Sequence, residues 1–211
     1  MASDLQNSAN IVLEVLGCVG NSEIDNNYNL YFERVVYFMK RLILICGANG
    51  IGKSTACKLL NEKLPRSAFI DSDYCRQMNP FSFTDEEIQI VISNISTMMV
   101  NYFKCSTIDN VIFQYGFHGV RKQIFDSILD VLSSNNISYY FCPVILYCEL
   151  DENLRRMKND NRDKERILRA IEKTRNIYDE YEYPKIDSTH LSVNETVSRI
   201  MDALEMNYTL V

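Results

Sequence analysis

The sequence predicts a three-layer α/β fold in which a parallel five-stranded sheet is covered by helices on both faces. Short apolar runs alternate along the chain with longer segments of helical periodicity, as expected when each crossover between parallel strands contains a helix. A glycine-rich loop also lies between the first apolar run and the helix that follows it. With 211 residues, 46% of them hydrophobic, the chain is large enough to bury one core of this kind.

Each strand is predicted from a short apolar run that is bounded by polar or turn-forming residues. These runs are residues 41–46, 67–70, 110–114, 143–148 and 184–187. Helices are predicted from apolar residues spaced three and four apart, and capping boxes begin two of them, at Thr84 and at Ser192. The predicted helices are residues 55–63, 84–104, 120–134, 152–158 and 164–181, followed by a last helix that begins near residue 192.

The composition argues against several classes of protein. A formal net charge of −6 and a pI near 5.0 disfavour a general nucleic-acid-binding surface, which needs clustered Lys and Arg. The seven cysteines form no C-x-x-C pair and only two histidines accompany them, so we expect reduced thiols and no zinc site. No apolar run is long enough to cross a membrane. We therefore expect a cytoplasmic protein whose partner is a small molecule, without a prediction of oligomeric state.

The loop at residues 47–55 matches the Walker A pattern G-x-x-x-x-G-K-[ST] at every fixed position. Its glycines permit backbone angles that turn successive N–H groups inward around an anion, and the next helix adds its positive N-terminus. Lys53 can then reach the outer phosphates, and the Ser54 hydroxyl is placed to ligate magnesium. The loop therefore predicts a site for ATP and Mg²⁺, formed by Gly47, Ala48, Asn49, Gly50, Ile51, Gly52, Lys53, Ser54 and Thr55.

Two acidic residues follow the second strand, at the edge of the sheet where ligands of such folds bind. In Asp71-Ser72-Asp73, one carboxylate can hold a magnesium-bound water while the other accepts a proton from an attacking hydroxyl. We assign Asp73 as the catalytic base that contacts the substrate and Asp71 as the metal-side partner, although the sequence also allows the reverse. Arg76 is placed to neutralise an anionic acceptor.

The third strand ends in Gln114 and Tyr115 rather than in an acidic residue. Motor-type and switch-type nucleotide hydrolases usually hold magnesium with an acidic residue at this point, so a motor ATPase is disfavoured. In the loop that follows, we expect Arg121 to contact substrate or phosphate, whereas His118 is interpreted as a packed or solvated histidine.

Arg162 and Arg166 are separated by about one helical turn, so they face the same side if a helix begins near Lys164. Fixed positive charge over a transferring phosphoryl group stabilises the transition state, and small kinases supply it from a closing lid. We therefore predict a short lid at residues 159–166 with both arginines as catalytic residues. The other arginines of this region are expected to support the lid or face solvent: Arg155, Arg156 and Arg169.

These observations divide the chain into two parts. Residues 1–38 carry no motif and are expected to be an N-terminal extension that is partly disordered. Residues 39–211 are predicted to form the nucleotide-binding domain, including the lid.

Together these motifs resemble those of the small P-loop kinases, a group that includes adenylate, shikimate and adenylylsulfate kinases, chloramphenicol phosphotransferase and the 5′-hydroxyl polynucleotide kinases. The resemblance spans about residues 39–205, and its strongest element is the loop at residues 47–55. The segment at residues 186–192, Ile-Asp-Ser-Thr-His-Leu-Ser, is similar to a turn that lies near the nucleotide base in that group. The resemblance implies a P-loop NTPase fold, ATP, magnesium and phosphoryl transfer, but it does not specify the acceptor.

Three functions are compatible with the sequence. The first is ATP-dependent phosphoryl transfer to a hydroxyl of a small molecule. The second is a kinase of nucleotides or of the 5′-hydroxyl ends of nucleic acids, although the acidic pI weighs against long polyanions. The third is a nucleotide-responsive regulatory or binding module with little turnover.

Overall fold

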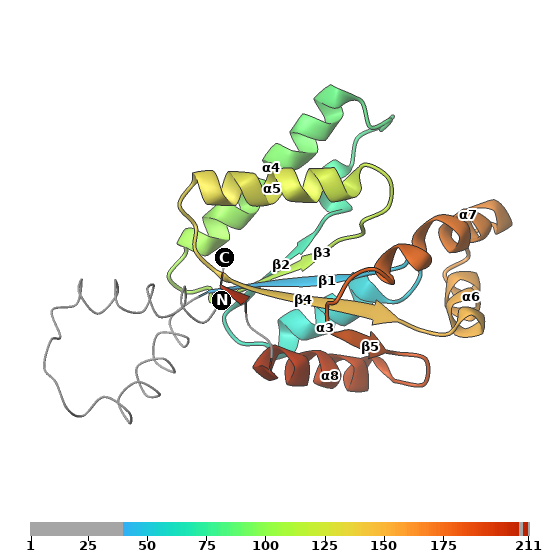
Figure 1. Cartoon of the computed structure of the whole chain (residues 1–211). Helices are drawn as coiled ribbons and strands as arrows, with labels where there is room; N and C mark the ends of the chain where they lie inside the picture. The colour runs from blue at the N-terminus through green and yellow to red at the C-terminus, as the bar shows by residue number, and fades with distance from the viewer. Residues whose placement is uncertain (1–39, 207–208, 211) are drawn as a thin grey trace, which may run out of the picture. The chain divides into compact units, whose positions relative to one another are not determined.

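The computed structural model describes residues 40–206 and 209–210 of the chain. The predicted N-terminal extension, residues 1–38, lies outside the described residues. Within the described part, one sheet has helices on both faces, which confirms the predicted three-layer α/β fold (Figure 1). Among the helices of residues 40–206, none combines the length and the apolar character that a membrane-spanning segment requires.

Five parallel strands form the sheet in the order β2-β3-β1-β4-β5, which confirms the predicted number and direction. A short sixth strand, which was not predicted, pairs antiparallel with β4. The bounds of the strands are β1 Arg41–Gly47, β2 Ser67–Asp71, β3 Asn110–Gln114, β4 Tyr140–Tyr147, β5 Lys185–Asp187 and β6 Thr209–Leu210.

The fourth strand begins at Tyr140, three residues before its predicted start at Pro143. Proline lacks an N–H group and is therefore normally confined to strand ends and sheet edges. It is tolerated inside β4 because β5 pairs with this strand only from Ile145 onward.

The first strand lies in the middle of the sheet, between β3 and β4. Its residues from Leu42 to Cys46 are each 0% exposed, as expected for a parallel strand covered on both faces. Because all five strands run in one direction, their carboxyl ends meet at one edge of the sheet. The loop that leaves β1 therefore lies at the centre of that edge, where the strand order reverses and ligands of such folds bind.

Helices α4 and α5 cover one face of the sheet, and α3 and α8 cover the other (Figure 1). Helices α6 and α7 lie beyond the carboxyl end of β4, in the region where the lid is predicted (Figure 1). The bounds are α3 Lys53–Lys63, α4 Asp85–Lys104, α5 Arg121–Ser134, α6 Leu150–Asn159, α7 Lys164–Thr174 and α8 Val193–Met206, with short 3₁₀ turns η1 Tyr74–Arg76 and η2 Asn176–Tyr178.

Both predicted capping boxes are present. The Glu87 N–H donates to Thr84 Oγ1 over 3.3 Å, and the Thr84 N–H donates back to Glu87 Oε2 over 3.0 Å. The Glu195 N–H likewise donates to Ser192 Oγ over 3.2 Å, and the Ser192 N–H donates to Glu195 Oε2 over 2.8 Å. Each pair satisfies N–H groups that the first turn of a helix leaves without partners.

The prediction of one continuous helix over residues 164–181 was wrong, because α7 ends at Thr174 and the turn η2 follows. The turn inserts Tyr178 into the core, where its side chain is 4% exposed. The Tyr178 hydroxyl accepts a hydrogen bond of 3.0 Å from the Phe117 N–H, and the two rings stack with centroids 5.9 Å apart. This long-range anchor bends the chain where local periodicity favours helix.

We expect Gly47→Ala to destabilise the protein strongly. Gly47 has a φ of +141°, and a Cβ at this position would lie 2.2 Å from the carbonyl oxygen of Leu146 in β4. The loss in free energy of unfolding should exceed the roughly 1–2 kcal/mol that a left-handed conformation costs a non-glycine residue, because the backbone of β4 must also move.

Gly119→Ala is the control for this prediction. Gly119 has a φ of +62° but no atom within 4 Å of the added Cβ, so only the conformational cost applies. Denaturant titration of both variants measures the difference, and equal losses would contradict the steric argument.

Candidate active site

A cavity of about 720 Å³ lies at the carboxyl ends of the strands, around the glycine-rich loop. It is lined by the loop, by the segments that follow β2 and β3, by α6 and α7, and by the turn that follows β5. All of the site residues predicted from the sequence line this cavity except Gly47, Ala48 and Asp71. The predicted residues that it brings together are Asn49, Gly50, Ile51, Gly52, Lys53, Ser54, Thr55, Asp73, Arg76, Arg121, Arg162 and Arg166.

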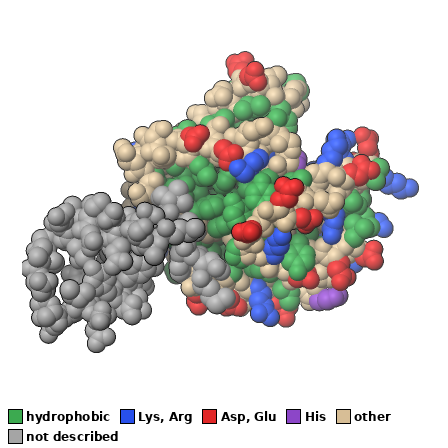
Figure 2. Space-filling view, in the orientation of Figure 1, with side chains coloured by type: hydrophobic (Ala, Val, Ile, Leu, Met, Phe, Trp, Pro, Cys, Tyr) green, Lys and Arg blue, Asp and Glu red, His purple; other side chains and the backbone are tan. Residues whose placement is uncertain are grey.

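The cavity is basic although the chain as a whole is acidic. Nine Lys and Arg side chains line it, against three Asp and Glu side chains, whereas the formal charge of the chain is −6. Figure 2 shows blue Lys and Arg side chains gathered at the end of the molecule where α6 and α7 lie. A cleft lined by one sign of charge concentrates ligands of the opposite sign. The cavity is therefore suited to a polyanion such as a nucleotide triphosphate.

The centre of the cavity is formed by the loop between β1 and α3. Gly50 and Gly52 have φ values of +78° and +98°, which only glycine adopts readily, and α3 begins at Lys53. The Lys53 ammonium group donates hydrogen bonds to the carbonyl oxygens of Gly47, over 2.9 Å, and of Ala48, over 2.8 Å. The lysine thus lies inside the curve of the loop, beside the N-terminus of the helix.

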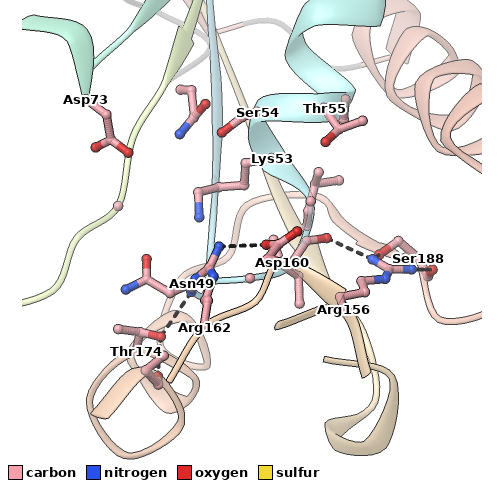
Figure 3. A pocket seen from close by; sticks show the side chains of 18 of the residues that line it. Asn49, Lys53, Ser54, Thr55, Asp73, Arg156, Asp160, Arg162, Thr174 and Ser188 are labelled. Carbon is pink, nitrogen blue, oxygen red and sulfur yellow. Dashed lines mark hydrogen bonds and ion pairs between the residues drawn. The ribbon is translucent and has the colours of Figure 1, made fainter. Parts of the chain in front are cut away.

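Burial lowers the pKa of Lys53 to about 8, because the charged ammonium group is removed from water. The nearby Asp73 carboxylate raises this pKa and the Arg162 guanidinium lowers it. Both effects require these charges to be close to Lys53. Figure 3 shows Asp73 and Arg162 on different sides of Lys53, although they come from distant parts of the sequence.

Side chains of α6 and α7 hold the tip of the loop in place. The Asn49 N–H donates to Thr174 Oγ1 over 3.1 Å (Figure 3), and Asn153 Nδ2 donates to the Asn49 carbonyl oxygen over 3.1 Å. Asn153 is 1% exposed and Thr174 is 2% exposed. Arg175 orients Asn153 through a bond of 3.0 Å to its Oδ1. The sequence carried no signal for these roles, since the residues lie within ordinary helical patterns.

Arg156 connects the loop to the turn that follows β5. Its Nη1 donates to the Ile51 carbonyl oxygen over 2.8 Å and to Ser188 Oγ over 3.0 Å, and its Nη2 donates to the Ser188 carbonyl oxygen over 2.6 Å. Glu152 accepts a further bond from Arg156 Nε over 2.6 Å. Arg156 is therefore a structural link between the loop and the turn after β5, whereas the sequence was interpreted as placing it in solvent or in support of the lid.

The two aspartates after β2 have different positions. Asp73 lines the cavity, and its carboxylate forms an ion pair with Arg76. Asp71 lines a separate pocket with Lys58 and Tyr74, and its Oδ1 accepts a hydrogen bond of 3.0 Å from the Asp73 N–H. The geometry therefore does not support the metal-side role that the sequence suggested for Asp71.

The end of β3 supplies a buried side-chain amide at the position where the sequence lacks an acidic residue. Gln114 is 6% exposed and lines the cavity, and its Oε1 has no hydrogen-bond partner among the described residues. Ser72, which is 2% exposed, lies on the same side of the cavity. Nearby, burial lowers the pKa of His118, which favours the neutral imidazole at neutral pH.

The predicted lid arginines lie between α6 and α7, in the case of Arg162, and at the start of α7, in the case of Arg166. Arg162 forms an ion pair of 3.0 Å with Asp160, and Arg166 lies in the first turn of α7. Asp163 caps that helix by accepting a bond of 2.7 Å from the Arg166 N–H. Both arginines line the cavity, as their spacing predicts.

We expect Arg156→Lys to lower the free energy of unfolding by about 1.5–3 kcal/mol, since lysine cannot reproduce the forked bonds to Ile51 and Ser188. Arg155→Lys is the matched control, because Arg155 pairs with the same Glu152 carboxylate but is 63% exposed, against 22% for Arg156. The control should lose about 1 kcal/mol or less. Denaturant titration compares the two, and a small loss in both variants would refute the proposed link.

Comparisons with solved structures give the same fold. A gluconokinase from Sinorhizobium meliloti 1021 aligns over 79% of this chain and 93% of its own, with a TM-score of 0.56 and 14% identity. The APS kinase of Mycobacterium tuberculosis, solved in complex with AMPPNP and APS, aligns over 79% and 98%, with a TM-score of 0.56 and 16% identity. The tunicamycin resistance protein of Deinococcus radiodurans aligns over 81% and 98%, with a TM-score of 0.54 and 16% identity.

At the level of sequence, no curated protein matches the chain. A family model described as AAA domain matches residues 43–182, which is more than half of the chain. The match includes the loop at residues 47–55, both aspartates after β2 and the segment that carries the lid arginines. The chain therefore belongs to the AAA domain family, and its fold is that of the small P-loop kinases.

Proposed function

We propose that the protein transfers the terminal phosphoryl group of ATP to a hydroxyl group of a small molecule. The observation that carries this proposal is the convergence of Lys53, Asp73 and Arg162 on one cavity around a phosphate-binding loop. Phosphoryl transfer depends mainly on positioning and on charge stabilisation, and these three side chains supply the charges that it needs.

The order of the strands gives the cavity two ends. The turn after β5 and Arg156 lie on one side of the central loop, and the segments after β2 and β3 lie on the other. We assign the first end to the nucleotide base, in line with the resemblance of residues 186–192 to a base-binding turn. The second end, which contains Asp73, is then the acceptor end.

In this arrangement, Lys53 and the loop N–H groups hold the β- and γ-phosphates. The acceptor hydroxyl attacks the γ-phosphorus, its proton passes to the Asp73 carboxylate, and the bond between the γ-phosphorus and its bridging oxygen breaks, releasing ADP. Arg162 and Arg166 neutralise charge on the transferring group. Arg162 pairs with Asp160 over 3.0 Å, and because the Asp160 side chain is largely exposed to water, we expect Arg162 to exchange this partner for a phosphate oxygen.

Magnesium fits the residues at the loop through one protein ligand, the Ser54 hydroxyl, which lines the cavity beside Lys53. Among the described residues there is no group of three or more His, Cys, Asp or Glu side chains that could hold a metal ion. Mg²⁺ commonly takes one or two protein ligands and completes its shell with phosphate oxygens and water. When bound, the ion would neutralise phosphate charge.

Two other functions remain distinct alternatives, and one assay separates all three. Purified protein is incubated with labelled ATP and Mg²⁺ and offered alcohols, sugar acids, nucleosides, nucleotides and 5′-hydroxyl oligonucleotides. Transfer to a small hydroxylated molecule supports the proposal, whereas transfer to nucleotides or oligonucleotides supports the second function. Slow release of phosphate to water with no transfer supports a regulatory module.

We expect Asp73→Asn to reduce phosphoryl transfer by about 100-fold or more, because the amide cannot accept the hydroxyl proton. Binding of ATP, followed by thermal shift, should be retained. Asp71→Asn is the matched control: it keeps an oxygen to accept the Asp73 N–H and should leave the rate within a few-fold of wild type. A large loss in Asp71→Asn with little loss in Asp73→Asn would reverse the two roles.

The lowered pKa of Lys53 predicts the pH dependence of ATP binding. Only the protonated amine attracts phosphate, and in the free protein its pKa is about 8. Affinity for Mg²⁺ and AMPPNP should therefore be constant below about pH 7 and fall above pH 8, by up to about tenfold per pH unit. Isothermal titration calorimetry measures this, and Lys53→Met should bind more weakly with a flatter profile; an unchanged slope in that variant would refute the assignment.

A further inference from the structure

Arg121, the first residue of α5, is buried without an acidic partner. It is 8% exposed and lines the cavity, and its guanidinium group makes no hydrogen bond or ion pair with any described residue. Removing a charge from water is costly unless a partner compensates for it. Two partly buried arginines nearby do have such partners: Arg156 donates to Glu152 and Ser188, and Arg175 donates to Asn153 and the Cys148 carbonyl.

Two aromatic rings position the Arg121 guanidinium instead. Its Cζ lies 6.0 Å from the centroid of the Tyr115 ring and 5.9 Å from that of the Phe83 ring. Aromatic faces attract a cation, but they use none of its N–H donors. The planar fork of five N–H groups is therefore held in place and remains available for a ligand that accepts hydrogen bonds.

The charges around Arg121 do not cancel. Of the ionisable side chains that line the acceptor end, Asp73 is already paired with Arg76, which leaves Arg121 as an excess positive charge. His118 cannot supply a compensating negative charge, because imidazole is either neutral or cationic, and burial lowers its pKa and so favours the neutral form. The neighbouring Gln114, with its unpartnered Oε1, contributes an uncharged amide. This end of the cavity therefore has a net charge suited to an anion.

We propose that the acceptor is a small anionic molecule, a hydroxylated carboxylate or phosphate ester, whose anionic group binds Arg121 while its hydroxyl reaches Asp73. This inference rests on the proposed phosphoryl transfer and extends it to the class of acceptor. Carboxylates and phosphates match the guanidinium fork with two parallel hydrogen bonds, which neutral alcohols cannot do.

The first test compares matched acceptors that differ only in their charge. The labelled ATP assay is run with D-glycerate against glycerol, gluconate against sorbitol, and ribose 5-phosphate against ribose. The wild-type protein should prefer the anionic member of a pair. The pair with the most active anionic member then shows whether the acceptor carries a carboxylate or a phosphate. Arg121→Gln should lose about 10- to 100-fold in kcat/KM for the anionic acceptor, the effect of removing one charged hydrogen-bonding partner. Arg121→Lys should recover part of this loss.

The control is Lys122→Gln, which removes one positive charge from the next residue of the same helix. Lys122 does not line the cavity, and its ammonium pairs with Asp126 on the surface. Thermal unfolding and the affinity for AMPPNP are measured for each variant. If Arg121→Gln does not fold, Arg121→Lys carries the comparison, because it keeps the charge and loses only the fork.

A second test does not depend on turnover. Inorganic phosphate is titrated into protein saturated with Mg²⁺ and AMPPNP, so that the nucleotide end is occupied, and binding is followed by calorimetry. Wild type and Lys122→Gln should bind phosphate equally, and Arg121→Gln should bind it about tenfold more weakly or worse.

The outcomes separate this inference from the proposed function. Equal use of neutral and anionic acceptors, or phosphate binding unchanged in Arg121→Gln, overturns the inference while phosphoryl transfer stands. Absence of transfer to every acceptor, together with Arg121-dependent phosphate binding, supports the anion site and overturns the kinase proposal. Absence of phosphate binding in wild type overturns the inference whatever the transfer assay gives.

Discussion

The structure depends on burying a lysine ammonium group inside a curved backbone loop. Lys53 is held by the carbonyl oxygens of Gly47 and Ala48, and its pKa is lowered to about 8 because water is excluded. A cation in such surroundings interacts with a phosphate far more strongly than an exposed cation does, since the local dielectric constant is low. The loop follows directly from β1, which is central in the sheet and buried from Leu42 to Cys46, and this anchors its first residues.

The order of the strands distributes chemistry around that loop. Because β3 and β2 lie on one side of β1 and β4 and β5 on the other, the segments after them form separate ends of one cavity. The tip of the loop is bonded to Asn153 of α6 and Thr174 of α7, and the predicted lid segment connects these two helices. A movement of α6 and α7 would therefore directly displace the backbone of the loop at residues 47–55.

Four arginines in and around the cavity fall into two kinds according to their partners. Arg156 and Arg175 donate hydrogen bonds to backbone and side-chain oxygens and so stabilise the fold around the cavity. Arg162 has one exchangeable acidic partner, and Arg121 has aromatic neighbours alone among the described residues. Sequence spacing does not separate these kinds, because an arginine's role depends on which acceptors the fold brings within reach.

The sequence by itself determined the features that depend on contiguous residues. The loop at residues 47–55, the two capping boxes and the five parallel strands all follow from local patterns, and the structure has them, although β4 begins three residues earlier than predicted. Only the tertiary structure decided which aspartate lines the cavity, since the turn after β2 places Asp73 there and leaves Asp71 in a separate pocket. It also ended α7 early, where Tyr178 is anchored to Phe117. These outcomes depend on contacts between residues far apart in the chain or on the direction of a turn, and neither leaves a periodic trace in the sequence.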